Sequence, residues 1–230
     1  MPISSKQTDL FSAVVKKASL KQEIYKRSLD VLFKFKKSAE SLARNYHEVI
    51  HQTQYPVPFE YKEISLFEFE LKFGSDVLVF FMHTNVFEIP RDHEVMKLPY
   101  IKEDKTRSYC GIIHIFNFLN DSFKYNRLND VGYLIGRVFI NREDHYFIEG
   151  KREVGLLYNN FPDAVLNQEA IDSIIESSIL YTINFDLLTP PFDDMKEVTV
   201  EEMLNVRDKM QIRTGKRLGF KFQADTIEEA

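Results

Sequence analysis

Five side chains of metal-binding type lie within twelve residues of one another: His83, Glu88, Asp92, His93 and Glu94. Imidazole and carboxylate groups suit zinc or manganese. Their spacing, however, matches no motif that would place two ligands on one face of a helix, and a proline interrupts the segment. We therefore expect a solvated polar loop here, and we expect the chain to bind no metal or other cofactor.

A second group consists of Asp130, Glu149 and Lys151, and the last two follow an expected strand. An acidic residue two positions before a lysine, after a hairpin and with an aspartate upstream, resembles the core of the PD-(D/E)xK nucleases. In that family two carboxylates bind magnesium and the lysine helps to activate water. The resemblance covers residues 130–151 and implies a metal-dependent nuclease or phosphodiesterase as an alternative function.

The expected hairpin geometry argues against this shared metal site. If Asn141 faces Asp144 across the turn, Glu149 lies opposite Gly136, and Asp130 lies six residues further along its strand. At about 3.3 Å per residue, the two carboxylates are then roughly 20 Å apart. They share a metal only if a bulge or a bent strand brings Asp130 back.

Other catalytic arrangements have even less support. Cys110 and His114 are four residues apart, which on a strand separates them by roughly 13 Å, too far for a thiolate and its base. Gly150 and Gly155 have the outer spacing of a phosphate-binding loop, but Leu156 replaces the required lysine. The Gly-x-Ser-x-Gly turn of serine hydrolases does not occur. We expect a protein without catalytic activity.

Charge is unevenly distributed along the 230 residues, whose formal net charge is −5. Residues 1–46 contain ten Lys or Arg against four Asp or Glu, whereas residues 47–206 contain fourteen against twenty-seven. Residues 207–222 are basic again, with six against one. Such asymmetry is typical of proteins that contact an acidic partner or nucleic acid, although the basic ends can also lie on the acidic body of the same chain.

The basic residues that we expect to contact a protein or ribonucleoprotein partner fall into two sets. The first forms a stripe on an expected helix: Arg27, Lys34, Lys37 and Arg44. The second lies in a C-terminal stretch that also contains glycine and phenylalanine, a composition able to grip phosphates and stack on bases: Arg213, Lys216, Arg217 and Lys221.

The elements that must position these residues begin with a helix. Apolar residues from about Leu20 to Ile50 recur at alternating steps of three and four, which predicts one amphipathic helix over this range. A shorter amphipathic stretch around Leu10 to Val15 predicts a separate helix before it. We expect the apolar stripe of 20–50 to pack on its own domain; the alternative is a homodimer through the same helix.

The middle of the chain predicts strands. Phe67 to Phe73 alternates apolar and charged residues, and Gly74-Ser75 favours a hairpin turn that places Phe69 opposite Phe80. The run 110–119 is interpreted as a strand, with a buried helix as the alternative. The expected strands are residues 67–73, 77–87, 110–119, 133–140 and 145–149, with a long loop over 89–108.

Two helices follow the strands. One begins after Asn167 and ends before Pro190, and the other runs from Thr199 to about Lys209. The fold class is α+β: a mainly antiparallel sheet of about five strands, flanked by a long N-terminal helix and two C-terminal helices. The chain divides into an N-terminal helical segment (1–53), an α+β core (54–210) and a C-terminal tail (211–230), expected to form one domain.

The longest stretch without a charged residue has thirteen residues, too few to cross a bilayer, and the first residues lack the apolar run of a secretory signal. With a single cysteine, these features favour a cytoplasmic protein without membrane contact. We expect a non-catalytic binding or regulatory protein. Besides the nuclease, a small-ligand sensor with a pocket between the sheet and a helix is the alternative function.

Overall fold

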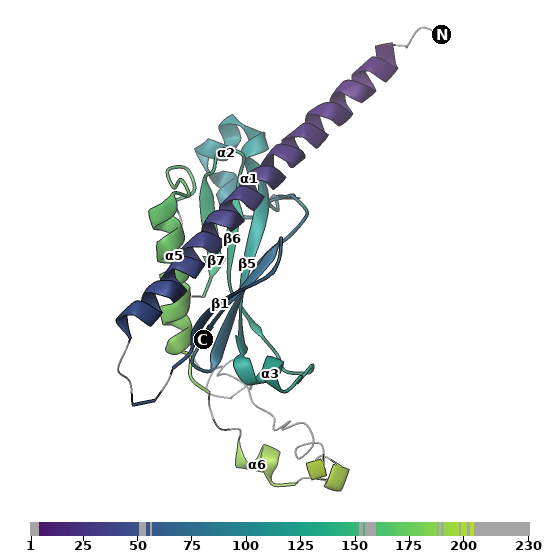
Figure 1. The fold of residues 1–230 in the computed structure, drawn as a ribbon. Coiled ribbons are helices and arrows are strands. Elements are labelled where there is room, and N and C mark those ends of the chain that lie inside the picture. The colour runs from purple at the N-terminus through teal and green to yellow at the C-terminus, as the bar shows by residue number, and fades with distance from the viewer. Residues whose placement is uncertain are drawn as a thin grey trace.

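The chain folds into an antiparallel sheet with a long and a shorter helix on one face (Figure 1). The structure, a computed structural model, describes residues 5–50, 54–55, 57–151, 154, 160–187, 189, 191–197, 199–201 and 203–204. The predicted α+β class is confirmed.

The first element, α1 (Ser5–Val49), is a continuous helix of 45 residues, about 68 Å long at 1.5 Å per residue. The prediction of a separate helix before residue 20 was wrong, because neither glycine nor proline lies within this range to end the helix. The apolar stripe predicted for its second half is confirmed. Its buried members include Ile24, Ser28, Val31, Phe35 and Ala39.

Seven strands form the sheet, in the spatial order β1-β2-β3-β5-β6-β7, with β4 paired to β5 outside this path. Their bounds are β1 (Phe59–Ser65), β2 (Glu68–Phe73), β3 (Asp76–Met82), β4 (Phe87–Glu88), β5 (Tyr109–Leu119), β6 (Tyr133–Ile140) and β7 (Tyr146–Gly150). About five strands were expected. Strand β1 was missed because its exposed positions carry glutamate and lysine, and β4 because it has only two residues.

The first predicted hairpin is confirmed in its register. Phe73 pairs with Asp76 and Phe69 with Phe80, and Gly74 takes the positive φ of 55° that this turn requires. Residues 109–119 form a strand. The interpretation of the run 110–119 as a strand is therefore confirmed, and the alternative of a buried helix was wrong.

The β6–β7 hairpin differs by one residue from its predicted register. Glu149 pairs with Arg137 and not with Gly136. The reason is a longer turn, in which Asp144 adopts a positive φ of 61° and the Asn141 side chain accepts hydrogen bonds from two backbone N–H groups at 2.9 and 3.1 Å.

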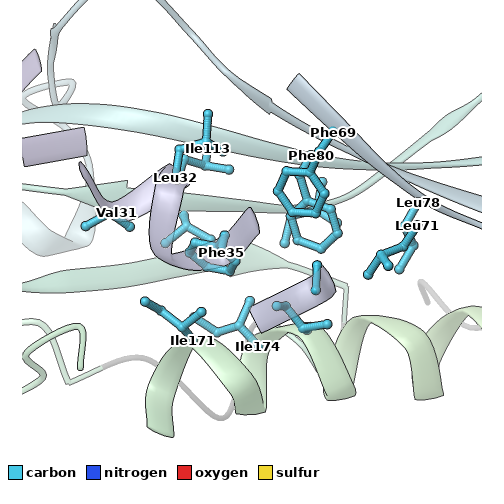
Figure 2. Packing of buried hydrophobic residues seen from close by; sticks show 14 of the residues in the cluster. Val31, Leu32, Phe35, Phe69, Leu71, Leu78, Phe80, Ile113, Ile171 and Ile174 are labelled. Atoms are coloured by element: carbon cyan, nitrogen blue, oxygen red, sulfur yellow. The ribbon is translucent and has the colours of Figure 1, made fainter. Parts of the chain in front are cut away.

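The main core lies between the sheet and the two helices α1 and α5 (Gln168–Ile183). Figure 2 shows Phe69 and Phe80 stacked beside Leu71 and Leu78, with helix residues Phe35, Ile171 and Ile174 close by. The Phe69 and Phe80 ring centroids are 4.6 Å apart. Buried side chains from the sheet and from both helices form one continuous cluster here.

The opposite face of the sheet carries a smaller cluster of buried residues: Ile89, Ile101, Cys110, Ile112, Phe139, Phe147 and Phe161. The segment predicted as a loop over 89–108 covers part of this face. It contains α2 (Pro99–Glu103) and two short 3₁₀ turns, Glu94–Lys97 and Lys105–Ser108.

Two further short helices are α3 (Asn120–Lys124) after β5, and α6 (Phe192–Met195) after α5. Asn167 caps α5 as predicted, because its side-chain oxygen accepts a hydrogen bond from the Ala170 N–H at 2.8 Å. The second predicted C-terminal helix, 199–209, is helical at its described residues 200–201 and 203–204, where the Met203 N–H donates to the Thr199 carbonyl at 3.0 Å. Residues 202 and 205–209 and the whole tail, 211–230, lie outside the described residues.

Candidate functional site

The predicted basic stripe of α1 is partly paired within the chain. Arg27 forms an ion pair of 2.8 Å with Asp144 and a second of 3.5 Å with Glu23. Arg44 pairs with Glu40 one helical turn away, at 3.3 Å. These two arginines are thus already neutralised by carboxylates of the same polypeptide.

Lys34 and Lys37 are exposed, and no carboxylate among the described residues forms an ion pair with either. Of the predicted stripe, these two lysines are therefore the more accessible cations. The other four predicted contact residues lie outside the described part of the chain: Arg213, Lys216, Arg217 and Lys221.

The N-terminal part of α1, residues 6–22, which we name the projecting arm, extends beyond the sheet (Figure 1). Nearly every residue of the arm is exposed, including four large apolar side chains that share one side of the helix. Their exposed fractions are 59% for Leu10, 54% for Phe11, 58% for Val14 and 62% for Val15. The sequence contained this signal, but the expected break before residue 20 hid its continuity with the buried part of α1.

The arm contains four lysines, of which Lys6, Lys17 and Lys21 lie beside the apolar strip and Lys16 lies on the other side of the helix. At the base of the arm the Lys17 ammonium lies 3.8 Å from the centre of the Tyr109 ring and hydrogen-bonds to its hydroxyl. That hydroxyl also donates to Glu88 at 2.5 Å. The arm thus combines an uncovered apolar strip with positive charge.

The three residues of the nuclease hypothesis have separate surroundings. Asp130 accepts a hydrogen bond from the Ser122 hydroxyl at 2.6 Å, in the turn after α3. Glu149 instead pairs with Arg137, in the middle of β6. The β5–β6 pairing has a register shift between Ile115 and Phe116, and the two carboxylates have different side-chain partners. Lys151 is exposed at the end of β7.

A cavity of about 560 Å³ lies on the sheet face opposite α1. Four of the five residues first considered as metal ligands line it, namely His83, Glu88, Asp92 and His93, whereas Glu94 pairs with Lys97. The sheet contributes a second polar set: His114, Arg137 and Glu149. Apolar residues complete the lining: Phe87, Ile89, Pro90, Ile112 and Phe139.

In the cavity, both carboxylate oxygens of Glu149 have partners. One carboxylate oxygen accepts from the His93 ring at 2.9 Å, and the other pairs with the Arg137 guanidinium. The other nitrogen of His93 accepts from the Val95 N–H at 3.2 Å, so the proton directed at Glu149 lies on Nε2. Since both nitrogens of His93 are engaged, this ring has no free lone pair with which to act as a general base.

The other two histidines of the cavity are less fully engaged. His83 Nδ1 accepts from the Asn85 N–H at 3.0 Å, which leaves Nε2 to carry the proton of the neutral ring. His114 Nδ1 is buried, and no group in the described part of the chain forms a hydrogen bond with it. Burial, together with the positive charge of Arg137 and the nearby His83, holds the pKa of His114 below its usual range.

Cys110 lies in the smaller apolar cluster and is fully buried. Burial raises the pKa of its thiol far above the usual value, so the thiolate needed for nucleophilic chemistry does not form near neutral pH. Cys110 acts as a small apolar side chain of the core.

Within the described ranges, no three His, Cys, Asp or Glu side chains are arranged so that they could hold a metal ion together. None of the helices in this part of the chain has an apolar stretch sufficient to cross a lipid bilayer. Comparison with family models, with curated proteins and with solved structures gave no match. The function must therefore be argued from the residues of this chain alone.

His114, Arg137 and Glu149 are the cavity residues that sequence reasoning did not bring together. Their positions on three neighbouring strands give them no common motif. The available signal was the alternation of side chains along β5 and β6, which places His114 and Arg137 on the same face. Alternation brings these two side chains together only if the register between β5 and β6 is known, and residue spacing along the sequence does not give that register.

Proposed function

We propose that this chain is a non-catalytic binding or regulatory protein of the cytoplasm that contacts a macromolecular partner through the projecting arm. The observation that carries this proposal is the exposure of Leu10, Phe11, Val14 and Val15 on a helix that continues from the core without a break. A soluble domain gains nothing from such a strip unless something covers it.

Helix physics supports the same interpretation. An isolated helix shorter than about 12–15 residues is marginal in water, and most helices in proteins owe their stability to a packed apolar face. The buried half of α1 has such a face, whereas the arm leaves its apolar side in solvent. If this apolar side packed into a groove of a partner, the same contacts would stabilise the helix of the arm and hold the partner.

The charges of the arm favour a particular kind of partner. The arm contains four lysines, three of them beside the strip, against one aspartate, Asp9. A protein groove with an apolar floor and acidic edges complements this pattern in both respects. The predicted basic residues of the tail, 213–221, would add to the attraction. A ribonucleoprotein is the other form of partner considered, and nuclease treatment of the complex distinguishes the two.

The surroundings of the expected catalytic groups favour binding over catalysis. Cys110 is buried with a raised pKa, both ring nitrogens of His93 are engaged, and Asp130 and Glu149 have different partners. Each of these groups has a structural role that requires no substrate.

The test is affinity capture of the full chain from its native cells, with the arm altered on one face. In the double variant Leu10→Asp/Val14→Asp, two carboxylates interrupt the apolar strip, and we expect roughly tenfold less of the partner to be retained. High salt should weaken capture by the unaltered protein, because it screens the lysines.

The matched control is Ser12→Asp/Ala13→Asp, which adds the same charge to the side of the arm away from the apolar strip. We expect this variant to retain its partner, and both variants to melt as the parent does, since all four positions are exposed. Equal loss in both variants would show that charge alone matters and would contradict an interface made by the apolar strip. So would equal retention in both.

A further inference from the structure

The cavity on the sheet face opposite α1 is a second site, separate from the apolar strip of the projecting arm. Its volume of about 560 Å³ lies within the range of roughly 300–1,000 Å³ that small-molecule sites occupy. Its floor is formed by rigid strands: His114 comes from β5, Arg137 from β6 and Glu149 from β7. A site built in this way needs no rearrangement to accept a ligand.

The carboxylate inside the cavity is already compensated. Glu149 pairs with Arg137 and accepts the Nε2 proton of His93, so it requires no cationic ligand. The described residues engage only the Nη2 atom of the Arg137 guanidinium in a hydrogen bond. Since guanidinium has five N–H donors in a planar fork, most of them are available to a ligand oxygen.

His83 adds a further donor to the floor of the cavity. Its Nδ1 is occupied by the Asn85 N–H, so the neutral ring presents its Nε2 proton. The ring centroids of His83 and His114 are 6.4 Å apart. Arg137 is also the cross-strand neighbour of His114. Donors from β6 and from the end of β3 therefore surround the same small space.

Two more carboxylates, Glu88 and Asp92, lie at the exposed rim. Water screens both, and the Tyr109 hydroxyl that donates to Glu88 also contacts the Lys17 ammonium. Glu88 and Asp92 therefore repel an anion in the cavity less than their two formal charges suggest. The apolar lining, with Phe87, Pro90 and Ile112, offers a surface for the body of an organic ligand.

We propose that this cavity binds a small organic anion, with a carboxylate held by Arg137 and His83 and an apolar body against Phe87, Ile112 and Phe139. The proposal does not rest on the apolar strip of the projecting arm; the arm reaches the rim of the cavity at its base, where Lys17 contacts the Tyr109 hydroxyl that donates to Glu88.

The first experiment compares three probes of the same shape on the full-length protein: 3-phenylpropionate, its neutral amide, and 3-phenylpropylamine. Binding is followed through the histidine ring signals in NMR spectra and through titration calorimetry. We expect the carboxylate to bind at least about tenfold more tightly than the amide, which lacks a charge-assisted hydrogen bond. Preference for the amine, or no shift of the His83 and His114 signals with any probe, would overturn the proposal.

The second experiment uses two variants with opposite expected effects. Arg137→Gln removes the main donor, and we expect the affinity for 3-phenylpropionate to fall by about tenfold or more. Glu149→Gln removes the competing carboxylate, and we expect the affinity to rise severalfold. A purely structural role of this pair would weaken binding in both variants, and that result would contradict the proposal.

Arg142→Gln is the matched control, because Arg142 lies in the turn between the same two strands and pairs with Asp104 at 4.0 Å. It removes one positive charge at a distance from the cavity and should leave the affinity unchanged. If Arg137→Gln does not fold, the probe series and Glu149→Gln still decide the outcome. Loss of arm-dependent partner capture would leave these results untouched, so the two proposals fail separately.

Discussion

The three cavity histidines show how the same residue type acquires different properties from its neighbours. His93 is fixed through both ring nitrogens, His83 through one, and His114 has a buried Nδ1 without a hydrogen-bond partner among the described residues. The sequence could place His83 and His93 near each other, since they are ten residues apart. It could not add His114 or Arg137, because their approach depends on the pairing of β3, β5 and β6.

His114 should make stability depend on pH. Burial first, and then the positive charge of Arg137 and the proximity of His83, lower its pKa in the folded protein. The unfolded chain therefore binds a proton more readily, and stability that is fully present above about pH 6.5 is lost as the pH falls towards the folded pKa. We expect His114→Phe to melt progressively higher relative to the parent between pH 7.5 and pH 5.

The matched control for this measurement is His114→Gln, which also removes the titrating ring but adds no apolar side chain. Its melting difference from the parent should change with pH in the same direction. A constant difference for both variants would show that this ring has no part in the acid sensitivity of the fold.

At the level of elements, α1 packs closely on β5 because two small residues meet. A Cβ atom added to Gly111 would lie 2.0 Å from the hydroxyl oxygen of Ser28 and 2.7 Å from its Cβ. The buried Ser28 hydroxyl donates to the Ile24 carbonyl at 2.9 Å, within the same helix. The sequence placed Ser28 in the apolar stripe, but gave no sign that its counterpart is a glycine 83 positions later.

Gly111→Ala should therefore destabilise the fold by about 1–3 kcal/mol, because the helix must shift away from the strand. Chemical denaturation measures this free energy of unfolding. Gly74→Ala is a useful comparison, since its added Cβ meets nothing within 4 Å and only the positive φ of 55° is strained.

A double-mutant cycle tests whether the contact itself is responsible. Ser28→Gly alone should cost about 1 kcal/mol, because glycine is unfavourable inside a helix. In Ser28→Gly/Gly111→Ala the two changes should cost less together than the sum of the single variants. Additive costs would contradict close packing at this crossing.

Other elements show where local sequence is sufficient and where it is not. The hairpin from Glu68 to Met82 followed from alternation and a Gly-Ser turn, both local signals. The turn around residue 143 contains no glycine, so its greater length and the shifted register of its hairpin depend on the conformation of Asp144 and on hydrogen bonds of Asn141. Strand β1, at the edge of the sheet, has charged exposed positions that obscure its alternation.

At the scale of the whole molecule, two explanations were considered for the charge pattern: basic segments that lie on the acidic body of the same chain, and basic segments that face a partner. Part of the basic N-terminal segment is bound to the acidic body, as Arg27 is to Asp144 and the buried Lys36 is to Glu63 at 2.6 Å. The projecting arm is different, because three of its four lysines lie beside an apolar strip that the described body does not cover. Charge counts alone could not predict where the packed part of α1 ends and the projecting arm begins, because that boundary depends on where the sheet ends beneath α1.

The most direct test of the central claim is site-specific photo-cross-linking in the native cells. A photoreactive amino acid, p-benzoylphenylalanine, replaces Val14 on the apolar side of the arm or Ser12 on the opposite side. An interface made by the strip predicts a discrete cross-linked partner from position 14, little or none from position 12, and loss of the position-14 product when Leu10→Asp is added. Equal products from both positions, or none from position 14, would contradict the claim that a partner covers this arm.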